Sequence, residues 1–172
     1  MLIPIVDIRK VKAPNRAHPT DAGMDFYCPQ INDKLVEDMK NNIANNGIQY
    51  EKEKGMLIIP PGVNAVIPSG IKVEIPYGYM GLFLNKSGVA SKKDLIIGAQ
   101  VIDTFYSGEV HIDLHNVGKN EIIIESDMKL AQMVLTSVIY PEPTYADESM
   151  LYSDMRLESE RGEGGFGSTN EK

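Results

Sequence analysis

The chain has 172 residues, a length typical of one domain, and 42% of them are hydrophobic and 24% charged. Its formal net charge of −7 and its isoelectric point near 5.0 argue against nonspecific binding to nucleic acid or to anionic membranes. The single cysteine, Cys28, excludes an intrachain disulfide framework, and no apolar run approaches the ~20 residues of a membrane span. With an apolar N-terminus too short for a signal peptide, these features predict a soluble, cytoplasmic protein.

The first predicted strand covers Ile5–Val11, and the first predicted helix covers Asp33–Asn46. One face of this helix carries four apolar residues: Leu35, Val36, Met39 and Ile43. Asp33 is expected to cap its beginning, and Asn46-Gly47 is expected to end it. We interpret the segment as an amphipathic helix that lies on the domain, with a partner-binding appendage as the alternative.

Beyond this helix the pattern is that of a β protein. The predicted strands are, in chain order, Met56–Ile59, Val63–Pro68, Ile71–Ile75, Tyr79–Leu84, Leu95–Ile97, Glu109–Leu114, Glu121–Glu125 and Lys129–Val138. Val110–Leu114 alternates with period two, as a half-buried strand does, and His111 and His115 share one face of it. Many short strands with frequent turns predict an all-β sandwich or jelly roll. No spacing of histidines or cysteine suggests a zinc site.

The segment from Arg161 to Thr169 cannot form a core, because it has four glycines and only one large apolar side chain. Its chemistry nevertheless suits a ligand. An arginine grips phosphate with a planar fork, glycine lets backbone N–H groups approach anionic oxygens, and an aromatic ring stacks on a base. We interpret it as a mobile arm that closes over a nucleoside polyphosphate, with a disordered terminus as the alternative.

Five segments, in order along nearly the whole chain, together resemble the trimeric dUTPase family. They are Ala22–Phe26 (AGMDF), Lys86–Ala90 (KSGVA), Gly98–Glu109 (GAQVIDTFYSGE), Lys129–Gln132 (KLAQ) and Arg161–Thr169 (RGEGGFGST). The third and the fifth are long and specific, and five matches in the family's order are unlikely to arise by chance.

The resemblance implies a distorted jelly roll of the β-clip type with one short helix. It predicts a domain over residues 1–158 and a flexible glycine-rich arm over 159–172. Residues 30–55 are interpreted as a helical insertion, because the family usually has a short connection between strands in this region. The resemblance also implies a homotrimer whose active sites are shared between chains. The implied reaction is the Mg²⁺-dependent hydrolysis of dUTP to dUMP and pyrophosphate, which cleans the nucleotide pool and supplies dUMP for dTMP synthesis.

Individual roles also follow from the resemblance. Asp103, where a predicted strand meets a turn, would activate the attacking water, although a turn-capping aspartate is the alternative. Tyr106 would exclude a 2′-hydroxyl, and Asp25 would bind Mg²⁺ through water. The implied substrate-binding residues are Lys86, Ser87, Gly88, Gly98, Ala99, Gln100, Val101, Tyr106, His111, Gln132, Arg161, Phe166, Gly167, Ser168 and Thr169.

The chain departs from the family pattern in three places. Lys86 stands where arginine is usual, Gln100 where many relatives have glycine, and Asp127-Met128 where Gly-Asp is typical. A lysine keeps the charge but loses the bidentate fork. Two other functions remain open at this point. One is a dCTP deaminase-like enzyme, since those enzymes resemble this fold, and the other is a regulatory protein that uses a dUTP pocket to switch partner binding.

Overall fold

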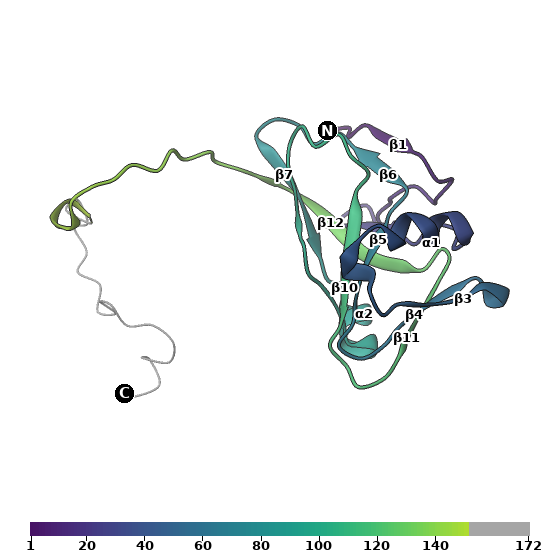
Figure 1. The fold of residues 1–172 in the computed structure, drawn as a ribbon. Helices are drawn as coiled ribbons and strands as arrows, with labels where there is room; N and C mark the ends of the chain where they lie inside the picture. The colour runs from purple at the N-terminus through teal and green to yellow at the C-terminus, as the bar shows by residue number, and fades with distance from the viewer. Residues whose placement is uncertain (152–172) are drawn as a thin grey trace. The chain divides into compact units, whose positions relative to one another are not determined.

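The computed structural model describes residues 1–151 (Figure 1). The chain divides into a compact unit of Met1–Ile139 and a second unit that begins at Tyr140. In the second unit the described residues form one short 3₁₀ helix, η3 (Glu148–Met150). The predicted arm over 159–172 lies outside the described residues. Among residues 1–151, no helix is long and apolar enough to cross a membrane.

Twelve strands within the first unit form four small antiparallel sheets. The first sheet pairs β1 (Ile5–Asp7) with β6 (Ile71–Val73), and the second has the order β5 (Asn64–Pro68), β10 (His111–Asn116), β8 (Leu95–Ile97). The third has the order β11 (Ile122–Glu125), β4 (Met56–Ile59), β3 (Gln49–Glu51), and the fourth β2 (Met24–Tyr27), β12 (Lys129–Ser137), β7 (Tyr79–Leu84), β9 (Val101–Ile102). This arrangement confirms the predicted all-β fold.

The four-stranded sheet contributes the aromatic centre of the core. Phe26 on β2 and Phe83 on β7 are each 1% exposed, and their rings meet edge to face with centroids 5.0 Å apart. An edge-to-face pair adds about 0.5–1.5 kcal/mol to the hydrophobic gain of burying both rings. The two rings therefore hold β2 and β7 against the same core, on either side of β12.

Residues 30–55 contain the predicted helix, which is shorter than expected. α1 (Asp33–Lys40) lies beside β5 (Figure 1) and buries Leu35 and Met39. The side chain of Asn32, not Asp33, caps its beginning by accepting the N–H of Leu35 at 3.0 Å, so the predicted cap was wrong by one residue. After α1 come two single-turn 3₁₀ helices, η1 (Ile43–Asn45) and η2 (Lys52–Lys54), with β3 between them.

Most predicted strands are present, with small changes at their ends. The first is shorter than predicted, because its pairing with β6 ends at Asp7 and the chain then bends, with Asp7 Oδ1 accepting the N–H groups of Arg9 and Val11. The predictions missed β2 and β3, whereas the strand expected just before Asp103 is present as β9. The one short helix implied by the resemblance is α2 (Ser87–Lys93).

Candidate active site

A buried carboxylate lies between two lysines at one edge of the four-stranded sheet. Asp25 on β2 is 4% exposed. Lys129, the first residue of β12, donates to Asp25 Oδ2 from Nζ at 2.7 Å, and Lys86, just before α2, donates from Nζ to Oδ1. The fold therefore joins three of the five motif segments at one carboxylate.

The lysines determine the charge of Asp25. Burial is the largest single influence and would raise the pKa of the carboxyl, but the hydrogen bonds and charges of Lys129 and Lys86 together outweigh it and lower this pKa. The hydrogen bond to Asp25 likewise raises the pKa of Lys129. The cluster thus combines one carboxylate with two lysine side chains, an excess of cationic groups that suits phosphate.

Gln132 joins this cluster through strand pairing. It lies opposite Asp25 across the β2–β12 pair and opposite Leu84 across the β12–β7 pair. Its amide Nε2 donates to the carbonyl of Asn85 at 2.9 Å, which satisfies one polar group of this half-buried side chain. Gly23 makes room for it, because a Cβ at that position would overlap Gln132 Oε1.

Three of the implied substrate-binding residues, Lys86, Ser87 and Gly88, lie where the chain enters α2. Ser87 and Gly88 are exposed and are the first two residues of the helix, so their N–H groups have no partner within it. A Cβ at Gly88 would meet no atom within 4 Å, which leaves open space above the loop. Lys86 therefore contacts Asp25 while the two amides beside it face solvent.

Asp103, the expected water-activating residue, and Tyr106, the expected sugar-selecting residue, lie in an exposed turn after β9. Asp103 is exposed and accepts the N–H of Tyr106 through its backbone carbonyl at 3.3 Å. Thr104 donates from Oγ1 to the carbonyl of Ile75 at 3.0 Å, which ties the turn to the segment after β6. Phe105 takes a φ of +64° in the turn, a left-handed conformation that costs free energy in any residue other than glycine.

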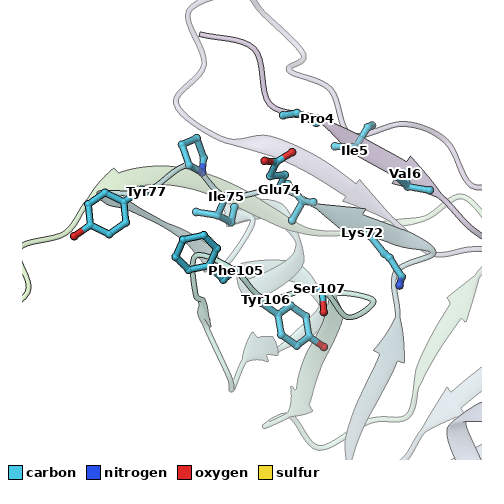
Figure 2. A pocket seen from close by; sticks show the side chains of 12 residues that line it. Pro4, Ile5, Val6, Lys72, Glu74, Ile75, Tyr77, Phe105, Tyr106 and Ser107 are labelled. Atoms are coloured by element: carbon cyan, nitrogen blue, oxygen red, sulfur yellow. The ribbon is translucent and has the colours of Figure 1, made fainter.

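An open pocket of about 340 Å³ lies beside this turn (Figure 2). Phe105 and Tyr106 line one side of it, and Ile5 and Val6 of β1 line the other. The Tyr106 and Phe105 side chains are 46% and 85% exposed, so both rings are accessible to a ligand.

The implied substrate-binding segment Gly98–Val101 already uses several of its backbone groups within the fold. The N–H of Gly98 donates to the carbonyl of Asp113 at 2.9 Å, and the N–H of Ala99 donates to Asp113 Oδ2 at 3.0 Å. The carbonyl of Gln100 accepts the N–H of Phe83 at 2.8 Å. The groups of this segment that can face a ligand are therefore fewer than the sequence suggested.

Asp113 is a residue that the sequence reasoning missed. It lies on β10 between His111 and His115, and its Oδ1 is the one buried side-chain oxygen or nitrogen without a hydrogen bond among the described residues. His115 contacts Asp113 Oδ2 through Nε2 at 3.1 Å, and His111 contacts the carbonyl of Glu109 through Nδ1 at 2.8 Å. The alternating pattern of this strand was the available signal, because it places all three polar side chains on one face.

The cluster around Asp25 and the turn that carries Asp103 do not meet within one chain. Asp25 lies on β2 and Asp103 follows β9, and these strands are the opposite edges of the four-stranded sheet. Three strand spacings separate the edges, which amounts to about 14 Å. Ile102, just before Asp103, pairs with Gly81, whereas Gln132 pairs with Leu84 further along β7. Arg161, Phe166, Gly167, Ser168 and Thr169 lie outside the described residues.

Comparison with known proteins identifies the family. The dUTPase family model matches residues 52–170. The chain belongs to the dUTPase family. Its sequence is 31% identical over 150 residues to a deoxyuridine 5′-triphosphate nucleotidohydrolase of Chlamydia trachomatis, covering 86% of this chain and 99% of the relative. It is 34% identical over 158 residues to one of Clostridioides difficile, covering 91% and 88%.

A solved dUTPase has the same fold. The dUTPase of Staphylococcus bacteriophage 80alpha with dUPNHPP superimposes with a TM-score of 0.71 at 25% identity, covering 97% of both chains. The family and the jelly-roll type fold expected from the five motif segments are thereby confirmed. Within the described residues of the present chain, the fold brings together the first, second and fourth motif segments. The third motif segment contains β9, at the other edge of the four-stranded sheet.

Proposed function

We propose that the chain is a dUTP diphosphatase, which hydrolyses dUTP to dUMP and pyrophosphate. The observation that carries the proposal is the dUTPase family match over residues 52–170, a range that includes Lys86, Asp103 and Tyr106. The reaction would remove dUTP from the nucleotide pool and supply dUMP for dTMP synthesis. We assign the enzyme to the cytoplasm, since a single buried cysteine suits a reducing compartment.

In the proposed reaction a water molecule attacks the α-phosphorus of dUTP. Asp103 accepts a proton from this water, the bond from the α-phosphorus to the oxygen bridging to the β-phosphate breaks, and pyrophosphate leaves with the electron pair. The exposed position of Asp103 supports this role, because both water and nucleotide can reach its carboxylate.

The exposed ring of Tyr106 is the proposed platform for the deoxyribose. A ring against C2′ of the sugar leaves no room for a hydroxyl, so UTP would be excluded. We assign uracil recognition to the backbone of Gly98–Val101 and to the strand around His111. Since Asp113 and Phe83 already bind part of that backbone, the base contacts fall to its remaining groups.

We assign the phosphates to Lys86, Ser87, Gly88 and Gln132. The positive charge of the cluster around Asp25 supports this assignment. Five residues of the C-terminal segment complete the proposed site: Arg161, Phe166, Gly167, Ser168 and Thr169. Arg161 would neutralise the terminal phosphates, and Phe166 would cover the uracil.

Mg²⁺ fits this site only together with the nucleotide. Among residues 1–151 no group of three His, Cys, Asp or Glu side chains is arranged to hold a metal ion, and both oxygens of Asp25 accept hydrogen bonds from lysines. Mg²⁺ keeps several waters and takes one or two carboxylates plus phosphate oxygens, so Asp25 suits its water shell when the triphosphate supplies the other ligands. The bound ion would neutralise phosphate charge.

We propose a homotrimer with shared active sites. The separation between Asp25 and Asp103 supports this assembly, because about 14 Å is too far for one carboxylate to hold the metal and the other to activate the water at the same α-phosphate. A second chain can bring its Asp103 turn to the Lys86 loop of the first.

The test measures pyrophosphate release from dUTP, UTP and dCTP, with ammonia release from dCTP as a parallel assay. The proposal expects pyrophosphate from dUTP with Mg²⁺, little from UTP and no ammonia from dCTP. Ammonia from dCTP without pyrophosphate from dUTP would establish the deaminase alternative. Binding of dUTP without hydrolysis would favour the regulatory alternative.

A further inference from the structure

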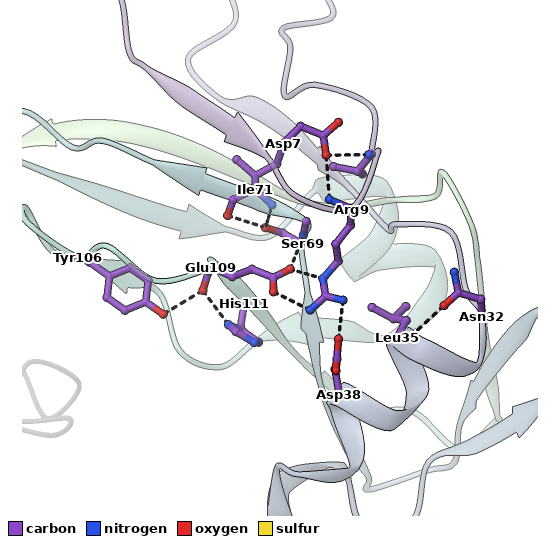
Figure 3. A network of polar contacts seen from close by, with 12 residues as sticks. Asp7, Arg9, Asn32, Leu35, Asp38, Ser69, Ile71, Tyr106, Glu109 and His111 are labelled. Atoms are coloured by element: carbon purple, nitrogen blue, oxygen red, sulfur yellow. Dashed lines mark hydrogen bonds and ion pairs between the residues drawn. The ribbon is translucent and has the colours of Figure 1, made fainter.

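One arginine connects the inserted helix to the turn that carries Tyr106 (Figure 3). Arg9 donates to both carboxylate oxygens of Glu109, from Nε to Oε1 at 2.6 Å and from Nη2 to Oε2 at 2.7 Å. Its Nη1 donates to Asp38 Oδ2 on α1 at 2.7 Å. The guanidinium thus binds one carboxylate with its fork and a second with its remaining side.

Glu109 in turn holds the Tyr106 ring. Its Oε1 also accepts the N–H of Gly70 at 2.7 Å, so the side chain is bound by both Arg9 and the backbone before β6. Its backbone carbonyl accepts the hydroxyl of Tyr106 at 2.9 Å, as Figure 3 shows, and also contacts His111 Nδ1. A displacement of Glu109 therefore displaces the acceptor of the Tyr106 hydroxyl.

The turn itself makes the ring dependent on this hydrogen bond. Tyr106 folds back over Gly108, where a Cβ would overlap its hydroxyl and ring. Tyr106 as a residue is 46% exposed, so the surrounding protein covers only part of it. Its direction is thus determined by the contact with Gly108 and by the hydroxyl bond to Glu109.

The ion pairs of Arg9 are partly shielded from solvent, so a displacement of Asp38 can be passed through Arg9 to Glu109. The side chains of Arg9 and Glu109 are 17% and 11% exposed, whereas that of Asp38 is 38% exposed. The hydrogen bond to Glu109, followed by that to Asp38, raises the pKa of Arg9 against the opposing effect of burial. Bidentate, partly buried pairs of this kind are strong and directional.

We propose that Asp38 of the inserted helix is a positioning residue for sugar selection, which acts on Tyr106 through Arg9 and Glu109. The inference rests on the proposed dUTP hydrolysis and on the sugar-stacking role of Tyr106. The insertion then has a function inside the enzyme. Its helix aligns Arg9, Arg9 aligns the Glu109 carboxylate, and the Glu109 carbonyl sets the direction of the ring that faces the deoxyribose.

The first experiment compares Asp38→Ala with Glu37→Ala, which removes the same charge from the adjacent, exposed position of α1. The readout is the ratio of kcat/KM for dUTP to kcat/KM for UTP, with melting temperature measured in parallel. Asp38→Ala should lower the ratio about three- to ten-fold, through a loss with dUTP greater than with UTP. Glu37→Ala should leave it unchanged.

The second experiment repeats Asp38→Ala in a Tyr106→Phe background, which keeps the ring but removes the hydroxyl bond to Glu109. In that background Asp38→Ala should have no further effect on the ratio. If Asp38 acts through the hydroxyl bond between Tyr106 and Glu109, its effect disappears in a double-mutant cycle once that bond is removed.

The inference is overturned if Asp38→Ala leaves the dUTP-to-UTP ratio of kcat/KM unchanged. It is also overturned if Asp38→Ala lowers this ratio as much in the Tyr106→Phe background as in the wild-type background. A lower melting temperature with an unchanged ratio would reduce Asp38 to a purely structural role. Failure of the proposed function looks different, since the wild-type protein itself would then not hydrolyse dUTP in preference to UTP.

Discussion

Lys129 Nζ lies 2.7 Å from Oδ2 of Asp25, and this contact joins the beginning of β12 to a buried carboxylate on β2. Lys86 binds the other oxygen of the same carboxylate from the loop before α2. An ammonium group has three N–H donors, so each lysine can keep its contact with Asp25 and also donate to a phosphate oxygen. A triphosphate bound there would bring phosphate ligands for the proposed Mg²⁺ close to the Asp25 carboxylate. Nucleotide and metal binding are therefore expected to be mutually dependent in this cluster.

The first prediction concerns acid stability. The folded-state pKa of Asp25 is lowered, so its carboxylate contributes stability that is fully present above the unfolded pKa of about 3.9 and is lost as the pH falls through the folded value. Asp25→Asn should destabilise the protein at neutral pH by about 1–3 kcal/mol, since two lysines lose a charged acceptor. The difference from wild type should shrink below about pH 4.

Denaturant unfolding at a series of pH values measures this difference. Glu121→Gln is the control, because it neutralises an exposed carboxylate on the protein surface and should change stability little at any pH. A difference between wild type and Asp25→Asn that stays constant from neutral to strongly acidic pH would contradict the prediction.

The second prediction concerns the thiol of Cys28. This residue is 0% exposed, and burial raises the pKa of its thiol to about 12, with Asp127 adding to the effect. Because the thiolate is the reactive form, Cys28 should resist a disulfide reagent such as DTNB at mildly alkaline pH until the protein is unfolded. Ser91→Cys, at an exposed position of α2, provides a thiol that should react in the folded state. Rapid labelling of the folded wild-type protein would contradict the buried position.

The third prediction tests the strained turn. Phe105 is 85% exposed at a φ of +64°, so its ring contributes little to the core while its backbone is strained. Phe105→Gly and Phe105→Ala both remove the ring, but only glycine tolerates the positive φ without cost. The glycine variant should therefore be more stable than the alanine variant by about 1 kcal/mol. Equal melting temperatures for the two variants would argue that the turn is not strained.

Much of the fold could be predicted because its strands follow their hydrophobic pattern. β4 and β7 begin and end at the predicted residues. β2 was missed because Asp25 interrupts its apolar run, and the lysines that make burial of this charge possible come from distant segments. The strand expected before Asp103 is β9, which has only two residues.

The site was predictable in its residues but not in its contacts. Motif segments identified Asp25, Lys86 and Gln132, yet nothing in their spacing indicated that the strand order β2, β12, β7 would place them together. Arg9 and Asp38 gave no signal, because a charged residue in a loop or on a helix is usually solvated. Their importance arises from a contact between the N-terminal segment and α1, which only the folded chain contains.

The fourth prediction concerns the proposed base. Asp103→Asn keeps the size of the side chain and removes its basicity, so kcat for dUTP should fall about 100-fold or more. Nucleotide affinity should change little, and so should stability, because Asp103 is exposed. Initial rates and titration with a non-hydrolysable dUTP analogue measure the two effects separately. A variant within a few-fold of wild-type kcat would remove Asp103 from the catalytic role.

The last prediction tests whether the two edges of the sheet come together between chains. Asp103→Asn removes the proposed base, and Lys86→Ala removes a proposed phosphate contact at the other edge, so each variant should be nearly inactive by itself. If each active site takes Asp103 from one chain and Lys86 from another, mixed trimers contain sites with both native residues. Random mixing of equal amounts makes about a quarter of the sites complete. Co-expression with two different affinity tags isolates the mixed assemblies, and separately purified trimers combined without exchange serve as the control. Mixed assemblies should recover activity well above that of either variant, whereas a site built within one chain would leave them as inactive as their parents.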